Sequence, residues 1–132
     1  MIKCVIRSVK NQADQKMKFY PAVVYTGTVT QTQLTDLISA KTTVTRADVV
    51  CVLAALEEAI AEKLANSQAV RLGDVGSFVT SIRSVGGEAD KNSVKADHIR
   101  TVRALFHPSA TMKRRLNEEA SPYLSKKRVL GA

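Results

Sequence analysis

The segment from Thr45 to Asn66 constrains the fold most, because its apolar residues recur with a helical period of about 3.6. Thr45 suits the N-cap position, and Asp48 suits the third helical position, where negative charge is favourable. Small side chains widen the apolar stripe, which consists of Val49, Val52, Leu53, Ala54, Ala55, Leu56, Ala59, Ile60, Ala61 and Leu64. Such a wide stripe favours close packing against more than one partner helix.

Two further helices are predicted. Thr30 and Gln33 have the spacing of a capping box, which predicts a helix from Thr30 to residues 40–42. The apolar face of this helix consists of Leu34, Leu37 and Ile38. A last helix is expected at 110–117, with Ser109 as its N-cap.

β-Branched and aromatic residues predict five strands, at 2–9, 17–25, 70–72, 77–83 and 99–106. The first two form a hairpin, in which Pro21 indicates a sheet edge or a bulge. The polar segment 84–97 contains Gly86 and Gly87 and should project as a flexible loop or β-arm. The order of strands and helices predicts an α+β fold.

The chain is basic, with 20 Lys and Arg against 12 Asp and Glu and a net charge of +8. A small basic domain favours a polyanionic partner, and nucleic acid is the first candidate. The charge is +2 over residues 1–82 and +6 over residues 83–132, which predicts the binding surface in the C-terminal half. The apolar positions are dense, so a dimer would bury their excess.

Several other classes of function lack support in the sequence. Cys4 and Cys51 form no C-x-x-C pair, and with His98 and His107 they have no metal-ligand spacing. We therefore expect no cofactor, no metal, no small-molecule substrate and no enzyme activity. No apolar run is long enough for a membrane span, and a cytoplasmic protein is expected. The hairpin aromatics favour a hairpin core over a stacking platform; they are Phe19, Tyr20 and Tyr25.

Several motifs in a fixed order carry a resemblance to a known family. The second helix opens with the segment 44–50, and the segment 70–78 is similar to a Gly-x-Gly-x-Phe strand turn. After an arm of suitable length, 106–109 is similar to a Phe-x-Pro-Gly sequence before a last helix. The chain from Leu34 to Leu116 thus resembles the bacterial histone-like HU and integration host factor family. The N-terminal hairpin resembles the extension of a subgroup from Bacteroides-type bacteria.

The resemblance implies an intertwined homodimer, with helices at the base and sheets forming a saddle from which two β-arms reach into the DNA minor groove. It implies architectural, non-specific or weakly specific binding of double-stranded DNA, and DNA condensation at the bacterial nucleoid. The domains would be an N-terminal β-hairpin extension at 1–29, an HU-like DNA-binding domain at 30–118 and a basic, flexible tail at 119–132.

The resemblance also implies which cations contact DNA. Arg83 and Arg103 lie on the outward faces of two adjacent strands at the base of the arm. The others lie in the arm, at its base or near the start of the last helix: Lys91, Lys95, His98, Arg100, Lys113 and Arg114. Their contacts would join a cation to a phosphate and would weaken with salt.

The arm departs from the family pattern. The family carries a proline at the arm tip, whereas the prolines of this chain are Pro21, Pro108 and Pro122. Val85 or Val94 would have to serve as the wedge. The arm also holds three acids, Glu88, Asp90 and Asp97, against two lysines. A second function therefore stays open: an HU-like structural or protein-interaction module with weak or no DNA binding.

Overall fold

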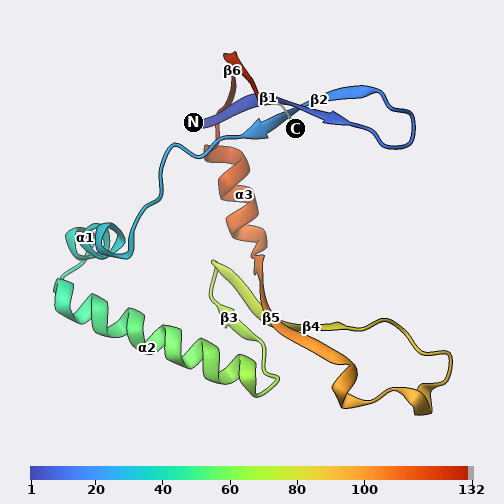
Figure 1. Ribbon diagram of the computed structural model, residues 1–132. Coiled ribbons are helices and arrows are strands. Elements are labelled where there is room, and N and C mark those ends of the chain that lie inside the picture. The colour runs from blue at the N-terminus through green and yellow to red at the C-terminus, as the bar shows by residue number, and fades with distance from the viewer. Residues whose placement is uncertain (131–132) are drawn as a thin grey trace. The chain divides into compact units, whose positions relative to one another are not determined.

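A computed structural model describes the backbone of residues 1–130 and the side chains of residues 1–125. The helices and strands (Figure 1) are β1 (Ile2–Lys10), β2 (Met17–Val23), α1 (Gln31–Lys41), α2 (Arg46–Ala65), β3 (Val70–Leu72), β4 (Gly76–Ser84), β5 (Ile99–Pro108), α3 (Ala110–Glu119) and β6 (Pro122–Leu130). Two compact units result. The terminal unit comprises Met1–Leu34 and the segment from Arg115 onward, and the central unit comprises Thr35–Arg114.

The central unit is built on an antiparallel sheet with the strand order β3-β4-β5. Phe78 pairs with Val70 on one side and Phe106 on the other, and the two phenyl centroids lie 5.1 Å apart. The α2 helix packs on this apolar face, where the Thr80 hydroxyl donates a hydrogen bond of 2.9 Å to the Leu64 carbonyl. The strands predicted at 70–72, 77–83 and 99–106 are thus confirmed to within a few residues.

The turn between β3 and β4 requires glycine. At Gly76 a Cβ atom would lie 2.7 Å from Phe106 Cε2 and would also meet the His107 carbonyl oxygen. Ser109 fixes the same turn to α3, because its N–H donates to the Val75 carbonyl at 3.1 Å and its hydroxyl donates to the Asp74 carbonyl. The sheet and the start of α3 therefore form one local structure.

The predicted helix caps are present. Gln33 donates its N–H to the Thr30 hydroxyl at 3.3 Å, and its side chain accepts the Thr30 N–H at 3.0 Å, which is the reciprocal capping box. The Thr45 hydroxyl accepts the Asp48 N–H at 3.3 Å at the start of α2. At α3 the Ser109 hydroxyl accepts the Met112 N–H at 3.0 Å. All three predicted helix starts are confirmed.

The terminal unit is a sheet with the strand order β2-β1-β6. The expected hairpin of β1 and β2 is present, and the Val24 N–H donates to the Lys3 carbonyl at 2.8 Å. Along β2 the backbone N–H groups point alternately toward β1 and away from it. At Pro21 the N–H would point away, so the missing donor lies on the free edge of the sheet. The aromatics expected in a hairpin core are instead exposed in the single chain: Phe19, Tyr20 and Tyr25.

A last strand lies within the segment 119–132, for which the sequence predicts a basic, flexible tail. Residues 122–130 form β6, which runs parallel to β1. Tyr123 and Leu124 supply the β-forming side chains, and the basic run at 126–128 hid this signal. The segment of the predicted tail at 131–132 lies outside the described residues. The two ends of the described chain therefore belong to one sheet, and not to two separate domains.

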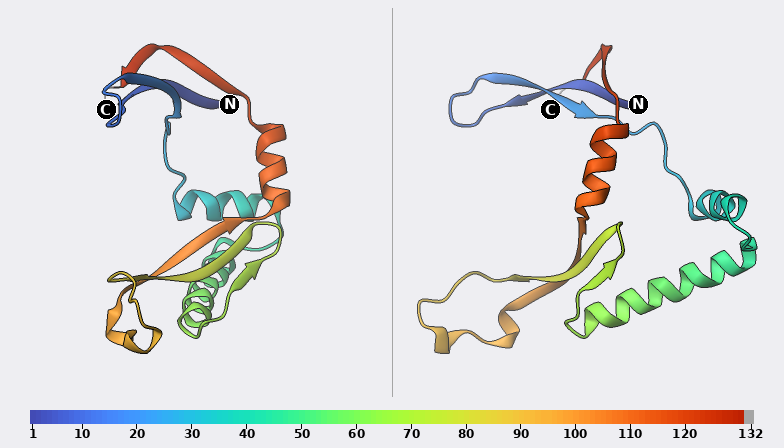
Figure 2. Two further views of the ribbon diagram at one scale, coloured as in Figure 1. Left: turned by 90° about the vertical axis from the view of Figure 1, so that its right-hand side faces the viewer. Right: turned by 180° about the vertical axis from the view of Figure 1, so that it is seen from behind.

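Of the two forms predicted for the segment 84–97, a flexible loop or a β-arm, the structure shows a loop. The ladder of β4 and β5 stops at Ser84 and Ile99, and the loop between them projects beyond the strands (Figure 2). The loop contains two 3-10 turns, η1 (Lys91–Ser93) and η2 (Ala96–His98). Asp90 accepts the Asn92 N–H at 3.1 Å and so favours a turn over a ladder. The loop is therefore not a β-ribbon.

Few apolar side chains are buried within the single chain. Val5 and Val49 are the buried hydrophobic residues of the described part. The α2 helix leaves Val50 and Val52 48% and 63% exposed. The accessible surface is 11024 Å², whereas two separate folded domains of these sizes would expose about 8,200 Å². The chain thus exposes far more surface than a folded monomer of its length.

Candidate nucleic-acid interface

The central sheet has an outer face opposite the one that packs on α2. The register of β4 and β5 pairs Arg83 with Thr101 and Ser81 with Arg103. Since side chains alternate along a strand, both arginines lie on the outer face, as the sequence predicted. Diagonal neighbours across two antiparallel strands are about 7–8 Å apart, so the two guanidinium groups can serve one ligand.

Both arginines are available for binding. Arg83 and Arg103 are exposed, and neither makes an ion pair or a hydrogen bond within the described residues. Hydroxyl groups of Ser77, Ser81 and Thr101 lie on the same face. Hydroxyls and guanidinium groups are the donors that commonly contact phosphates, so the face has the chemistry of a phosphate-binding surface.

Arg71 extends this face and was missed in the sequence. It pairs with Ser77, which pairs in turn with His107, and this row lies on the outer face. The row of Arg71 is six residues from Arg83 along β4, which corresponds to about 20 Å. The sequence does show a charged residue between two apolar ones in the short strand β3. Only the strand register, however, places Arg71 on the same face as Arg83.

The other predicted residues near the loop are more dispersed. Lys91 lies in η1, and Lys95 precedes η2, where its N–H donates to His98 Nδ1 at 3.5 Å. Arg100 lies at a β-bulge, because the register shifts between Arg83 and Ser84. With three acids against two lysines, the loop is not a basic arm.

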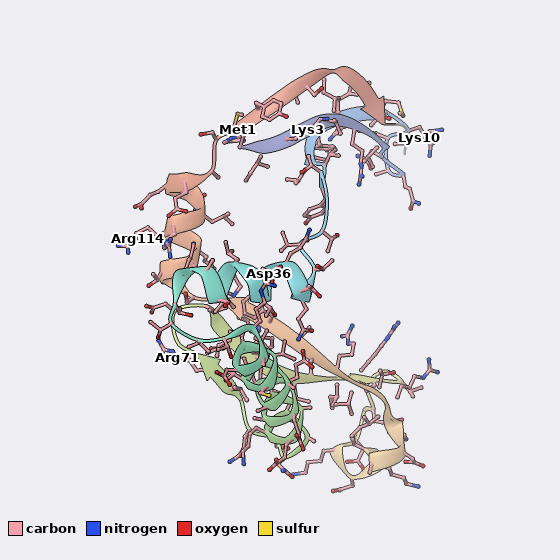
Figure 3. All side chains as sticks on the ribbon, turned by 90° about the vertical axis from the view of Figure 1, so that its left-hand side faces the viewer. Met1, Lys3, Lys10, Asp36, Arg71 and Arg114 are labelled. Atoms are coloured by element: carbon pink, nitrogen blue, oxygen red, sulfur yellow. The ribbon has the colours of Figure 1, made fainter. Side chains whose placement is uncertain are left out.

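Lys113 and Arg114 lie on the first turns of α3 and not on the sheet. The Lys113 N–H donates to the Ser109 carbonyl at 3.0 Å, as expected for a helix start. Arg114 is exposed and points away from α3 (Figure 3). The structure therefore brings Arg83 and Arg103 together on one face and leaves Lys113 and Arg114 on a separate element.

The described residues hold no other recognisable kind of site. No group of three or more His, Cys, Asp or Glu residues is placed there to hold a metal ion. Cys4 and Cys51 are both free thiols. No helix within the described residues is long and apolar enough to span a membrane.

Comparison with known proteins places this geometry in context. The model of a family described as HU domain fused to wHTH, Ig, or glycine-rich motif (HU-HIG) matches residues 2–122. No curated protein matches the chain.

Two solved structures are similar in fold. A proposed bacterial DNA-binding protein from Bacteroides vulgatus is 18% identical, with a TM-score of 0.63 over 99% of this chain and 50% of its own. The chain therefore spans half the length of that protein. HU from Anabaena, crystallised with DNA, is 21% identical, with a TM-score of 0.52 over 66% of this chain and 96% of its own.

Proposed function

The chain belongs to the HU-HIG family of HU domains fused to other motifs, and from this premise we propose that it binds duplex DNA through the outer face of its central sheet. The observation that carries the proposal is the pair Arg83 and Arg103, both exposed and unpaired on that face. The Anabaena HU, whose fold is similar, was crystallised with DNA, which supports the same ligand class. The proposed role requires no catalytic chemistry.

The contacts join cations to phosphates and carry little sequence preference. Arg83, Arg103 and Arg71 supply the main contacts on the sheet. Peripheral contacts come from the loop, the bulge and α3, through Lys91, Lys95, His98, Arg100, Lys113 and Arg114. The loop holds no proline and has more acids than lysines. The sheet therefore supplies most of the binding free energy, and the loop contributes little to it. Such a protein acts at the bacterial nucleoid, where it condenses DNA.

The binding unit is an intertwined homodimer. Residues 49–56 of α2 are eight consecutive apolar residues, so the helix is apolar around its whole circumference over this stretch. A helix of this kind is stable only when it is covered on more than one side. The central sheet covers one side, and the exposed fractions of Val50 and Val52 support a second chain on the other.

A titration of labelled duplex DNA tests the proposal. Binding should weaken steeply with salt, and replacing both Arg83 and Arg103 by Ala should reduce the affinity at least tenfold. A dimer would lose four phosphate contacts, so the slope of log K against log salt should become shallower by about 3–4.

The matched control replaces Lys41 and Lys63 by Ala, which removes the same charge from α1 and α2. Its affinity should stay close to that of the unchanged protein. Equal affinity for the Arg83→Ala, Arg103→Ala protein would exclude the outer face as the binding site.

A second function, a structural or protein-interaction module, is favoured by one observation. The central unit has eleven Lys and Arg against nine Asp and Glu, a net charge of only +2. A protein with this function would remain dimeric. In the same titration it would not bind the labelled duplex at physiological salt.

A further inference from the structure

The terminal unit carries most of the excess charge of the chain. It has nine Lys and Arg against three Asp and Glu, a net charge of +6, whereas the central unit has +2. This excess of positive charge is not visible when the sequence is divided into two halves, because the terminal unit combines residues from both ends of the chain. A unit of this charge is itself a candidate for binding a polyanion.

Three of the cations of this unit lie on one face of the terminal sheet. The register pairs Arg7 with Tyr20 and Lys3 with Tyr123, and Lys18 lies two residues from Tyr20 along β2. Alternation places these side chains on one face, which we call the tyrosine face: Lys3, Arg7, Lys18, Tyr20 and Tyr123. The opposite face is largely apolar, with Cys4, Ile6, Met17, Phe19, Val23 and Leu124.

The tyrosine face is open at its two tyrosines, whereas Val5, which lies on the same face between Lys3 and Arg7, is buried. Tyr20 and Tyr123 are 50% and 44% exposed. The side chains of Lys3, Arg7 and Lys18 make no ion pair or hydrogen bond within the described residues. Lys3 and Arg7 are four residues apart on β1, which corresponds to about 13 Å, so the cations form a track and not a single point.

The third strand, β6, pairs irregularly with β1 beside this track. The register of β1 and β6 shifts between Cys4 and Ile6, which leaves the segment 125–128 as a bulge opposite Val5. A bulge re-aims the strand locally and is common beside binding sites.

We propose that the tyrosine face binds single-stranded nucleic acid. Bases stack on Tyr20 and Tyr123, and the phosphates between them lie along Lys3, Arg7 and Lys18. Stacking requires bases with free faces, which a duplex does not offer and a single strand does, so an unpaired strand fits this face better than a duplex. This site is distinct from the outer face of the central sheet and does not rest on the function proposed for that face.

Fluorescence anisotropy of the full chain with labelled oligothymidylate of about 12 nucleotides tests the proposal, because this probe has no base pairs. Replacing Arg7 and Lys18 by Gln should weaken binding about tenfold and make the salt slope shallower by about 1.4 for each chain. Tyr20→Leu keeps the apolar bulk but removes the ring, and should weaken binding at least about fivefold.

The matched control replaces Lys10 and Lys16 by Gln, which removes the same charge from the same hairpin. Lys10 lies on the opposite face and Lys16 lies in the turn, so affinity should stay within about twofold. Equal losses in the two double variants would overturn the proposal, because they would show diffuse attraction. Tighter binding of a duplex of equal length, lost in the Arg7→Gln, Lys18→Gln protein, would also overturn it.

The same titrations in the Arg83→Ala, Arg103→Ala protein separate the two sites. Loss of duplex binding with oligothymidylate binding retained supports both assignments. An unaltered oligothymidylate affinity in the Arg7→Gln, Lys18→Gln protein overturns the tyrosine face alone, whatever the duplex result.

Discussion

Gly76 illustrates how one residue can fix the orientation of the candidate DNA-binding face. Its backbone runs against the His107 carbonyl and the Phe106 ring, at the point where β3 turns into β4 and β5 ends. Because Ser109 bonds to the same turn, a shift here would also displace the start of α3. The close approach therefore couples Arg71 on β3 to the arginines on β4 and β5.

Gly76→Ala should destabilise the central unit by about 3 kcal/mol, because the new methyl group meets the His107 carbonyl and the Phe106 ring. The Tm should fall by more than about 10 °C in a thermal melt followed by circular dichroism. Gly73→Ala is the control: its backbone has φ of 48° but nothing lies near the added Cβ, so the loss should be about 1–2 kcal/mol. Equal losses would contradict the packing argument.

At the scale of elements, β2 is an edge strand that Pro21 protects. The strand carries exposed apolar side chains at Met17, Phe19 and Val23, and an edge of this kind invites pairing with another chain. A residue without an N–H on the free edge interrupts the row of donors that such pairing needs. Pro21 therefore helps to keep the terminal sheet at three strands.

Pro21→Val should promote association through β2, because it restores an N–H to the free edge. Sedimentation velocity over a range of concentrations should show species larger than those of the unchanged protein. Ala22→Val is the matched control, since the Ala22 backbone faces β1 and its change adds bulk without an edge donor. Association of both variants to the same extent would point to the added side chain as the cause.

The sequence predicted those helices and strands whose formation depends on residues close together in the chain. The caps at Thr30, Thr45 and Ser109 each depend on residues three positions away, and all three are present. The strand β6 was missed because its pairing with β1 joins distant segments, and no local pattern reports a parallel partner.

The same distinction applies to the two candidate sites. Arg83 and Arg103 were placed on the outer face from alternation within long strands. Arg71 and the tyrosine face depend on which strands are neighbours, and strand order in a sheet cannot be read from alternation alone. The side chains were visible in the sequence, but their common face was not.

At the scale of the whole molecule, the uncovered apolar surface supports the dimer that we propose. The α2 helix contributes to this surface, because its wide apolar stripe leaves Val50 and Val52 exposed beyond what the central sheet covers. Burial of Val50 and Val52 between two chains would add about 1.5–3 kcal/mol for each fully covered side chain.

Val52→Glu should therefore dissociate or unfold the proposed dimer, because it would place a charge in the interface. Light scattering coupled to size-exclusion chromatography measures the mass, and a thermal melt measures the stability. Val94→Glu makes the same change at a loop residue with a similar exposed fraction, 59% against 63%. It should alter neither mass nor Tm, and a monomeric unchanged protein would contradict the dimer.

The pairing of β6 with β1 also has a consequence for how the chain is made. During synthesis β1 and β2 leave the ribosome before β6, and a lone two-stranded hairpin is only marginally stable in water. The third strand follows only after the whole central unit, and closing so long a loop slows the pairing. We therefore expect the terminal sheet to become stable later than the central unit, when β6 has emerged and paired with β1.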